Sequence, residues 1–232
     1  MSESISAAAD AQKVTPRIVL DRHRDAFAQV LPPTINLDRW LRLAESAINA
    51  SAGLLDIFRR DRGASALKAL MKCAQLGHEP GSGLFHLVPK GQAIEGWEDY
   101  KGILQRILRS ALYAKVVVAP VYANDEYAFD VNVDERPRHK QAAGDRGEPV
   151  RAYAYAVHRD GSTSTIAEAT PAMIAGAKAK GHKTDASTSP WQNPRAPMHQ
   201  KVAVRELERF VSTSAVDLRV TGDVTDLIIE EP

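Results

Sequence analysis

Positively charged side chains recur at helical spacing near the end of this 232-residue chain. The segment Ala196–Ser212 predicts a helix, and Lys201, Arg205 and Arg209 follow one another at intervals of four residues within it. Residues four apart lie on nearly the same side of a helix, so these three cations form a basic stripe. A basic stripe suits contact with a polyanion, although a solvated helix face is the more frequent origin of this pattern.

Charge is unevenly distributed along the chain, although the formal net charge is only +1. Between Ala172 and Phe210, seven Lys and Arg residues stand against three Asp and Glu residues, a local net charge of +4. Lys178, Lys180 and Lys183 carry this charge into the loop before the basic stripe. Between Asp217 and Pro232, five acidic residues stand against one arginine, a local net charge of −4. The overall charge is therefore a poor guide to the local field.

A second segment, residues 96–110 (GWEDYKGILQRILRS), combines cations with aromatic rings. Its apolar side chains have helical spacing and are expected to pack inward: Ile103, Leu104, Ile107 and Leu108. The cations expected on the other faces are Lys101, Arg106 and Arg109, with Trp97 and Tyr100 just before them. Cations beside aromatic rings suit an anionic polymer whose units stack. An ordinary amphipathic helix with solvated cations is the alternative interpretation.

Known catalytic signatures are missing from the sequence. It has no phosphate-binding GxxxxGK[ST] loop, no dinucleotide fingerprint, no GxSxG nucleophile elbow and no HExxH zinc helix. Cys73 and His78 are too few for a zinc site, and a buried structural cysteine is the simpler interpretation. Asp125, Glu126 and Asp130 have the ligand chemistry for Mg²⁺ in a nuclease, but acids in a turn are more often solvated. We therefore predict no catalytic residue, no metal and no cofactor.

The composition indicates an ordinary globular chain, with 44% hydrophobic and 25% charged residues. No apolar run approaches the roughly 18 residues that span a bilayer, and the N-terminus lacks the pattern of a signal peptide. A single cysteine excludes an internal disulfide. We expect a cytoplasmic protein that does not contact membranes.

The elements that must position the cations combine helices with short strands. We expect a flexible, partly helical N-terminal arm over residues 1–34 and an acidic tail over residues 215–232. Helices are predicted at 36–50, with Asn36 as its cap, at 64–76, ended by Gly77, and at 171–181, opened by Thr170 and Pro171. Strands are predicted at 84–88, 92–97, 113–122, 126–133, 151–158 and 164–169, with a mobile loop at 134–149. This pattern predicts an α+β fold.

The order of several segments resembles the RecT family of phage-type single-strand annealing proteins. The segments are LMKCAQLGHEPGSGLFHLVPKG, DYKGILQRILRS, VYANDEYAFD, VRAYAYAVHRDG and SPWQNPRAPMHQKVAVRELERF. Together they span residues 67–214. Each motif is short, but their joint order and spacing are fairly specific.

The resemblance implies one α+β core domain, residues 35–214, in which a small antiparallel sheet packs with helices and the chains assemble into rings or helical filaments. It implies a basic groove that holds DNA and pairs complementary strands without ATP, in a bacterial host cell, beside a partner exonuclease and the host single-strand-binding protein. The DNA-binding candidates are Lys101, Arg106, Arg109, Arg151, Lys178, Lys183, Lys201 and Arg205. Candidates for base stacking or packing are Trp97, Tyr100 and Trp191.

Three functions follow from these expectations. Strand annealing fits first, because it makes no covalent bond and needs only that cations offset the repulsion between two polyanions. A protective binder of single-stranded DNA that does not pair strands is the second. A Mg²⁺-dependent nuclease using Asp125, Glu126 and Asp130 is the third.

Overall fold

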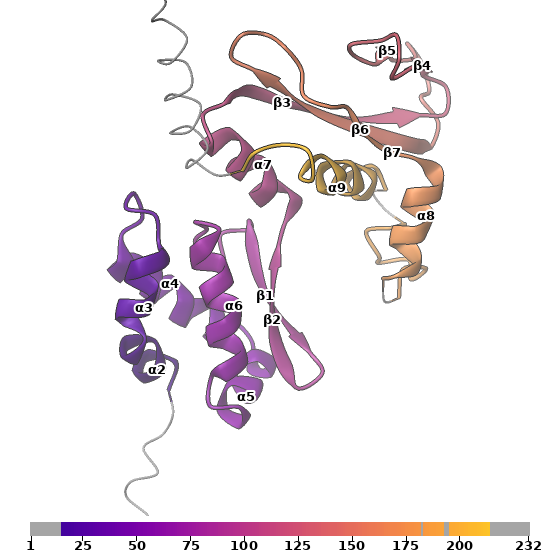
Figure 1. The fold of residues 1–232 in the computed structure, drawn as a ribbon. Helices are drawn as coiled ribbons and strands as arrows, with labels where there is room; N and C mark the ends of the chain where they lie inside the picture. Colours follow the sequence, from indigo (N-terminus) through magenta and orange to yellow (C-terminus); the bar gives the residue numbers. More distant parts are fainter. Residues whose placement is uncertain (1–14, 182, 193–194, 214–232) are drawn as a thin grey trace, which may run out of the picture. The chain divides into compact units, whose positions relative to one another are not determined.

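A computed structural model of the protein describes residues 15–181, 183–192 and 195–213. The chain forms two compact units, residues 1–102 and 103–232. Figure 1 shows helices with a hairpin in the first unit, and a sheet with helices in the second. Helices combined with small antiparallel sheets confirm the predicted α+β class. None of the described helices is long and apolar enough to cross a membrane.

In the described part of the first unit, helices precede a β-hairpin. The elements are α2 (Pro16–Arg22), α3 (Arg24–Val30), α4 (Leu37–Asn49), α5 (Ala52–Arg60), α6 (Ala64–Gln75), β1 (Phe85–Lys90) and β2 (Ala93–Glu98). Local signals set the helix ends. The side chain of Asn36 accepts the backbone N–H of Arg39 at 2.9 Å, and Gly77 follows α6 with a φ of 64°. Both predicted helix ends are therefore confirmed.

The core of the first unit includes the fully buried ring of Trp40. This ring lies 4.9 Å from that of Phe27, and its Nε1 donates to the carbonyl of His78 at 2.7 Å. Phe27 belongs to α3, so part of the predicted N-terminal arm is helical and packs into this core. Residues 1–14 of that arm lie outside the described residues.

The β1–β2 hairpin has one buried and one open face. Phe85 pairs with Glu98 and Pro89 with Ile94 on the side toward α6, where Phe85 and Ile94 are buried. The alternate pairs point to the other side, because neighbouring residues of a strand face opposite ways. His86 and Trp97 are paired there, and the indole of Trp97 is 48% exposed.

Helix α7 (Tyr100–Arg109) follows the hairpin directly, as the sequence predicts. Ile103 and Ile107 are fully buried, which confirms the predicted apolar face at these positions. Leu108 is 45% exposed, so the prediction that it packs inward is wrong. A helix turns by about 100° per residue, so Leu108 points well away from the side defined by Ile103 and Ile107.

The second unit contains a three-stranded antiparallel sheet in the order β3–β6–β7. Its strands are β3 (Tyr113–Tyr122), β6 (Pro149–His158) and β7 (Ala167–Ala169), and a separate pair joins β4 (Glu126–Ala128) to β5 (Arg138–Lys140). The strand predicted at 126–133 is shorter than expected, because only β4 (Glu126–Ala128) forms within that range. The predicted mobile loop at 134–149 contains β5, which pairs with β4 and is therefore ordered there.

Helix α9 (Ala196–Leu207) packs across the sheet, whereas α8 (Pro171–Ala179) touches it at β6. On the side of the sheet that α9 covers, β6 and β7 present buried alanines: Ala152, Ala154, Ala156, Ala167 and Ala169. We call these five residues the alanine face. Methyl groups leave room for the buried side chains Val204 and Leu207 of α9. The last helix ends at Leu207 rather than at the predicted Ser212, and Phe210 beyond it is 51% exposed.

Candidate nucleic-acid interface

The start of α7 is fixed by its neighbours in the first unit. The carboxylate of Asp99 accepts the backbone N–H of Lys101 at 3.0 Å. The imidazole Nε2 of buried His78 lies 2.6 Å from a carboxylate oxygen of buried Glu98. Gly102 fits tightly against this pair, because a Cβ there would lie 3.1 Å from the His78 Nε2. Lys101 is therefore held at the surface by a rigid helix start.

Arg106 does not lie on an open surface. It is only 8% exposed, and its guanidinium forms an ion pair with the carboxylate of Glu208, just beyond α9. The pair connects residues 102 positions apart in the sequence. The prediction of an outward-facing Arg106 is thus corrected: a buried charge is paired because leaving it unpaired is costly. Arg109, one turn further along, is exposed.

The basic stripe of the last helix points away from the sheet. Ala203, Val204 and Leu207 are buried against the sheet, whereas Lys201 is half-buried and Arg205 is exposed. The third cation of the stripe, Arg209, lies beyond the end of α9 and bonds to Glu206 at 2.7 Å. Lys201 and Arg205 therefore form the outward part of the stripe, and their contact with DNA stays a prediction.

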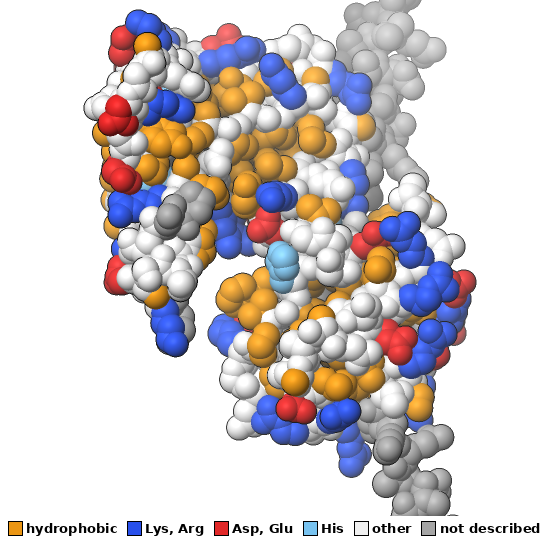
Figure 2. Space-filling view, turned by 180° about the vertical axis from the view of Figure 1, so that it is seen from behind, with side chains coloured by type: hydrophobic (Ala, Val, Ile, Leu, Met, Phe, Trp, Pro, Cys, Tyr) orange, Lys and Arg blue, Asp and Glu red, His pale blue; other side chains and the backbone are white. Residues whose placement is uncertain are grey.

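Two other predicted cations are engaged with acids in the second unit. Arg151 of β6 donates to Glu168 of β7 at 3.2 Å and lies over the ring of Tyr127. The ammonium of Lys178 lies 2.7 Å from the carboxylate of Asp185. Lys183 is exposed, with a φ of 51°. Figure 2 shows, on the face that it displays, that Lys and Arg side chains are scattered with Asp and Glu among them.

The three aromatic candidates differ in exposure. Trp97 stands on the open face of the hairpin, and its Nε1 donates to Glu95 at 2.9 Å, which holds the indole in place. Tyr100 at the start of α7 and Trp191 before α9 are half-buried. A fixed and exposed indole is the form in which an aromatic ring stacks on a base. Trp97 is accordingly the best placed of the three.

Asp125 is the centre of a buried network rather than a metal ligand. Its fully buried carboxylate accepts the Arg146 guanidinium at 3.0 and 2.6 Å. It also accepts the backbone N–H of Tyr122 and of Ala142, each at 3.0 Å, and lies 3.0 Å from the ring of His139. The bond from Arg146 contributes most to lowering the pKa of Asp125 well below its usual range. The carboxylate is therefore ionised and already satisfied.

The nuclease hypothesis loses its proposed ligands in this arrangement. Glu126 pairs with Lys140 at 3.0 Å, and Asp130 accepts the backbone N–H of Asn132 at 2.9 Å. Across the described ranges, no three His, Cys, Asp or Glu side chains are grouped so that they could hold a metal ion. Cys73 is buried, and burial raises the pKa of its thiol, which favours the structural role expected for it.

Sequence reasoning missed an aromatic cluster on the side of the sheet opposite the alanine face. The rings of Tyr153 and Tyr155 are stacked with centroids 6.2 Å apart, and Tyr127 stacks on Tyr153 at 5.7 Å. The hydroxyl of Tyr127 donates to Glu168 at 2.9 Å, and His139 lies 3.2 Å from the Tyr153 hydroxyl. The alternation RAYAYAVH indicates that both tyrosines share a face, but nothing local indicates their partners. The cluster holds the β4–β5 pair against the sheet.

Comparison with known proteins identifies the family to which the chain belongs. The sequence model that describes the RecT family matches residues 39–223, which are most of the chain. The chain is also similar to Protein RecT of Escherichia coli (strain K12), with 26% identity over 203 residues, which cover 82% of this chain and 72% of that protein. The chain therefore belongs to the RecT family, whose members anneal single-stranded DNA in recombination.

Proposed function

We propose that this protein binds single-stranded DNA along exposed cations and accelerates the pairing of complementary strands without ATP, as an annealing protein rather than a bond-making enzyme. The observation that carries this proposal is the placement of α9. One side of the helix is locked against the alanine face, so Lys201 and Arg205 are presented outward in a fixed direction.

The physical task of annealing fits such a surface. Two complementary strands repel each other through their phosphates, and cations along the protein offset this repulsion and release counterions. Contacts to phosphate carry no sequence information, so base edges stay available for pairing. Base pairing, rather than the protein, then selects the correct partner strand.

The proposed interface is narrower than the sequence prediction. Its cations in the second unit are the exposed Arg109, Lys183 and Arg205 and the half-buried Lys201, and the exposed Lys101 is the candidate of the first unit. Arg151 and Lys178 would contribute only after exchanging their carboxylate partners for phosphate, and Arg106 has a structural role. Trp97 is the proposed stacking residue.

Assembly and partners extend the proposal. Rings or helical filaments of this chain would align the cations of many copies along one strand. A partner exonuclease would supply single-stranded ends, and the host single-strand-binding protein would occupy the same DNA beforehand. The resemblance to the RecT family is what supports each of these partners.

The test is a salt series on the Lys201→Glu/Arg205→Glu variant. Each phosphate contact contributes about 0.7 to the slope of log affinity against log salt for single strands, so the variant should lose roughly 1.4 in slope. It should weaken binding to every sequence similarly, and it should slow annealing of two labelled complementary oligonucleotides without ATP. Lys68→Glu/Lys72→Glu is the matched control, since both lysines are exposed on α6.

Three results would count against the proposal. Unchanged affinity in the variant would remove α9 from the interface. Tight binding by the unmodified protein with no acceleration of pairing would favour a protective binder instead. Cleavage of labelled DNA on long incubation with Mg²⁺ would return the nuclease hypothesis.

A further inference from the structure

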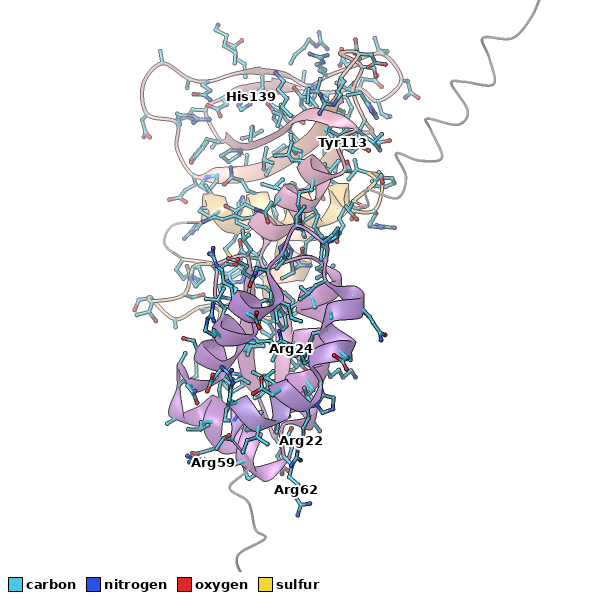
Figure 3. The ribbon with its side chains drawn as sticks, turned by 90° about the vertical axis from the view of Figure 1, so that its left-hand side faces the viewer. Arg22, Arg24, Arg59, Arg62, Tyr113 and His139 are labelled. Atoms are coloured by element: carbon cyan, nitrogen blue, oxygen red, sulfur yellow. The ribbon has the colours of Figure 1, made fainter. Side chains whose placement is uncertain are left out.

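The first unit carries an arginine cluster that the proposed interface does not use. Arg59 and Arg60 occupy the last turn of α5, Arg62 follows in the turn to α6, and Arg22 occupies the last turn of α2. We call these four residues the arginine end. All four are exposed. Figure 3 shows the labelled side chains of Arg22, Arg59 and Arg62 at the same end of the helical unit.

Close packing brings the two helix ends together. A Cβ on Gly63 would lie 2.7 Å from the ring of Phe58 and 3.2 Å from the side chain of Val19, so this turn lies directly against α2. Arg22 comes three residues after Val19 and therefore lies on a neighbouring part of the same helix side. The turn that carries Arg62 and the helix that carries Arg22 are thus in contact through buried residues.

The two acids of the α5–α6 segment, Asp56 and Asp61, do little to neutralise Arg59 and Arg62. The carboxylate of Asp61 accepts the backbone N–H of Gly63 and of Ser65, each at 2.9 Å, so it caps the next helix. The Asp56 carboxylate lies 3.9 Å from the guanidinium of Arg59, and both side chains are about two-thirds exposed. A long and exposed ion pair of this kind contributes little.

The chemistry of the side chains points to phosphate as the ligand. All four cations are arginines, and the planar guanidinium binds phosphate through two parallel hydrogen bonds, which lysine does not match. Arg62 has a φ of 55° and precedes Gly63, whose φ is 85°, so it lies at the tip of the turn between α5 and α6.

We propose that the arginine end binds the phosphate backbone of a second nucleic-acid strand. This inference rests on the proposed function, in which the cations of α9 bind the first strand. The arginine end belongs to the first unit and the α9 stripe to the second, so one chain carries two separate sets of cations. If the α9 cations bind only the first strand, binding of the second strand needs another set of cations, and the arginine end would supply it.

The experiment measures capture of a second strand that is unable to pair. The full-length protein is loaded with donor-labelled oligothymidine, acceptor-labelled oligothymidine is added, and energy transfer reports that both are bound. Anisotropy at limiting DNA reports binding of the first strand. The variant is Arg59→Gln/Arg62→Gln, in which glutamine preserves helix propensity at Arg59 and removes the charge at both positions, and Lys68→Gln/Lys72→Gln is the matched control on α6.

The arginine variant should lose about fivefold or more in affinity for the second strand, as expected for removed phosphate contacts, with first-strand affinity close to that of the unmodified protein. Arg59→Lys/Arg62→Lys, which keeps the charge, should recover capture in part. Arg62→Gly retains the left-handed turn, so a loss of capture in this variant excludes misfolding as the cause.

Several outcomes would overturn the inference. Equal capture by the arginine variant and the control is the clearest. Competition by polyglutamate as effective as that by oligothymidine of equal charge would assign the arginine end to an acidic protein segment. If the unmodified protein anneals strands and the arginine variant captures the second strand normally, this inference is refuted and the proposed function stands. If the arginine variant loses capture but the unmodified protein does not anneal strands, the inference stands and the proposed function is refuted. A protein that binds no oligothymidine would refute both.

Discussion

Gly102 shows how a single residue positions the start of the proposed interface. It lies within α7 and has no unusual φ, so its requirement for glycine comes from space alone. A Cβ at this position would lie 2.8 Å from the carbonyl oxygen of Leu84 and 2.9 Å from the side chain of Glu98. Because backbone and the buried side chains of His78 and Glu98 surround it, little can move to make room.

Gly102→Ala should therefore destabilise the protein by about 2 kcal/mol through overpacking, as measured by urea unfolding. Gly53→Ala is the control, since a Cβ there meets nothing within 4 Å and alanine favours a helix by up to about 1 kcal/mol. Equal stability of the Gly102→Ala protein would mean that α7 shifts without cost.

At the scale of elements, the ion pair between Arg106 and Glu208 ties α7 to the end of α9. The pair is largely buried on the Arg106 side, so its partners depend on each other. Helices α7 and α9 both carry proposed DNA-binding cations, and the inward-facing guanidinium of Arg106 links α7 to the end of α9.

A double-mutant cycle of Arg106→Gln and Glu208→Gln tests this role. The two substitutions should be coupled by about 1 kcal/mol or more in unfolding free energy, because either one alone breaks the same pair. Both should change DNA affinity only slightly and in opposite directions. A large loss of affinity in Arg106→Gln alone would show that Arg106 contacts phosphate after all.

Local signals explain which elements the sequence predicts. Asn36 and Gly77 limit α4 and α6 through bonds to residues at most a few positions away, so these ends are visible in the sequence. Helix α5 is missed although Ser51 caps it and Leu54, Ile57 and Phe58 recur at helical spacing, because it is only nine residues long; the packing of α3 through Phe27 is missed as well. Short helices form through tertiary packing more than through propensity.

The candidate site follows the same division. The direction of Lys201 and Arg205 follows from helical periodicity, which acts over a few residues. The partner of Arg106 lies 102 positions away, and the Asp125 network joins residues 14 and 21 positions apart across two chain segments. Nothing in a local pattern distinguishes a cation that faces solvent from one that meets a distant acid.

At the scale of the whole molecule, positive and negative charge are concentrated in different parts of the chain. Residues 217–232 carry a net charge of −4, so the rest of the chain carries +5 although the total is +1. These tail residues lie outside the described residues, and their charge is known from the sequence. Association with DNA should respond to both parts, because a net field acts before contact forms.

Removal of residues 217–232 should raise the association rate with an oligonucleotide about threefold or more at low salt, since the negative charge no longer repels DNA. Stopped-flow mixing measures this rate. The difference should vanish at about 1 M salt, where the screening length falls to about 3 Å. A rate that stays unchanged at low salt would show that the tail charge does not reach the DNA-binding surface.

The alanine face has a consequence for how the protein tolerates substitution. Because its methyl groups set the distance and the rotation of α9, the direction of the proposed DNA-binding cations depends on residues that carry no charge themselves. Substitutions are then poorly tolerated at the alanine face and well tolerated on the outward side of α9. The cations of α9 can be exchanged or repositioned while the scaffold stays the same, so binding strength can change independently of the fold.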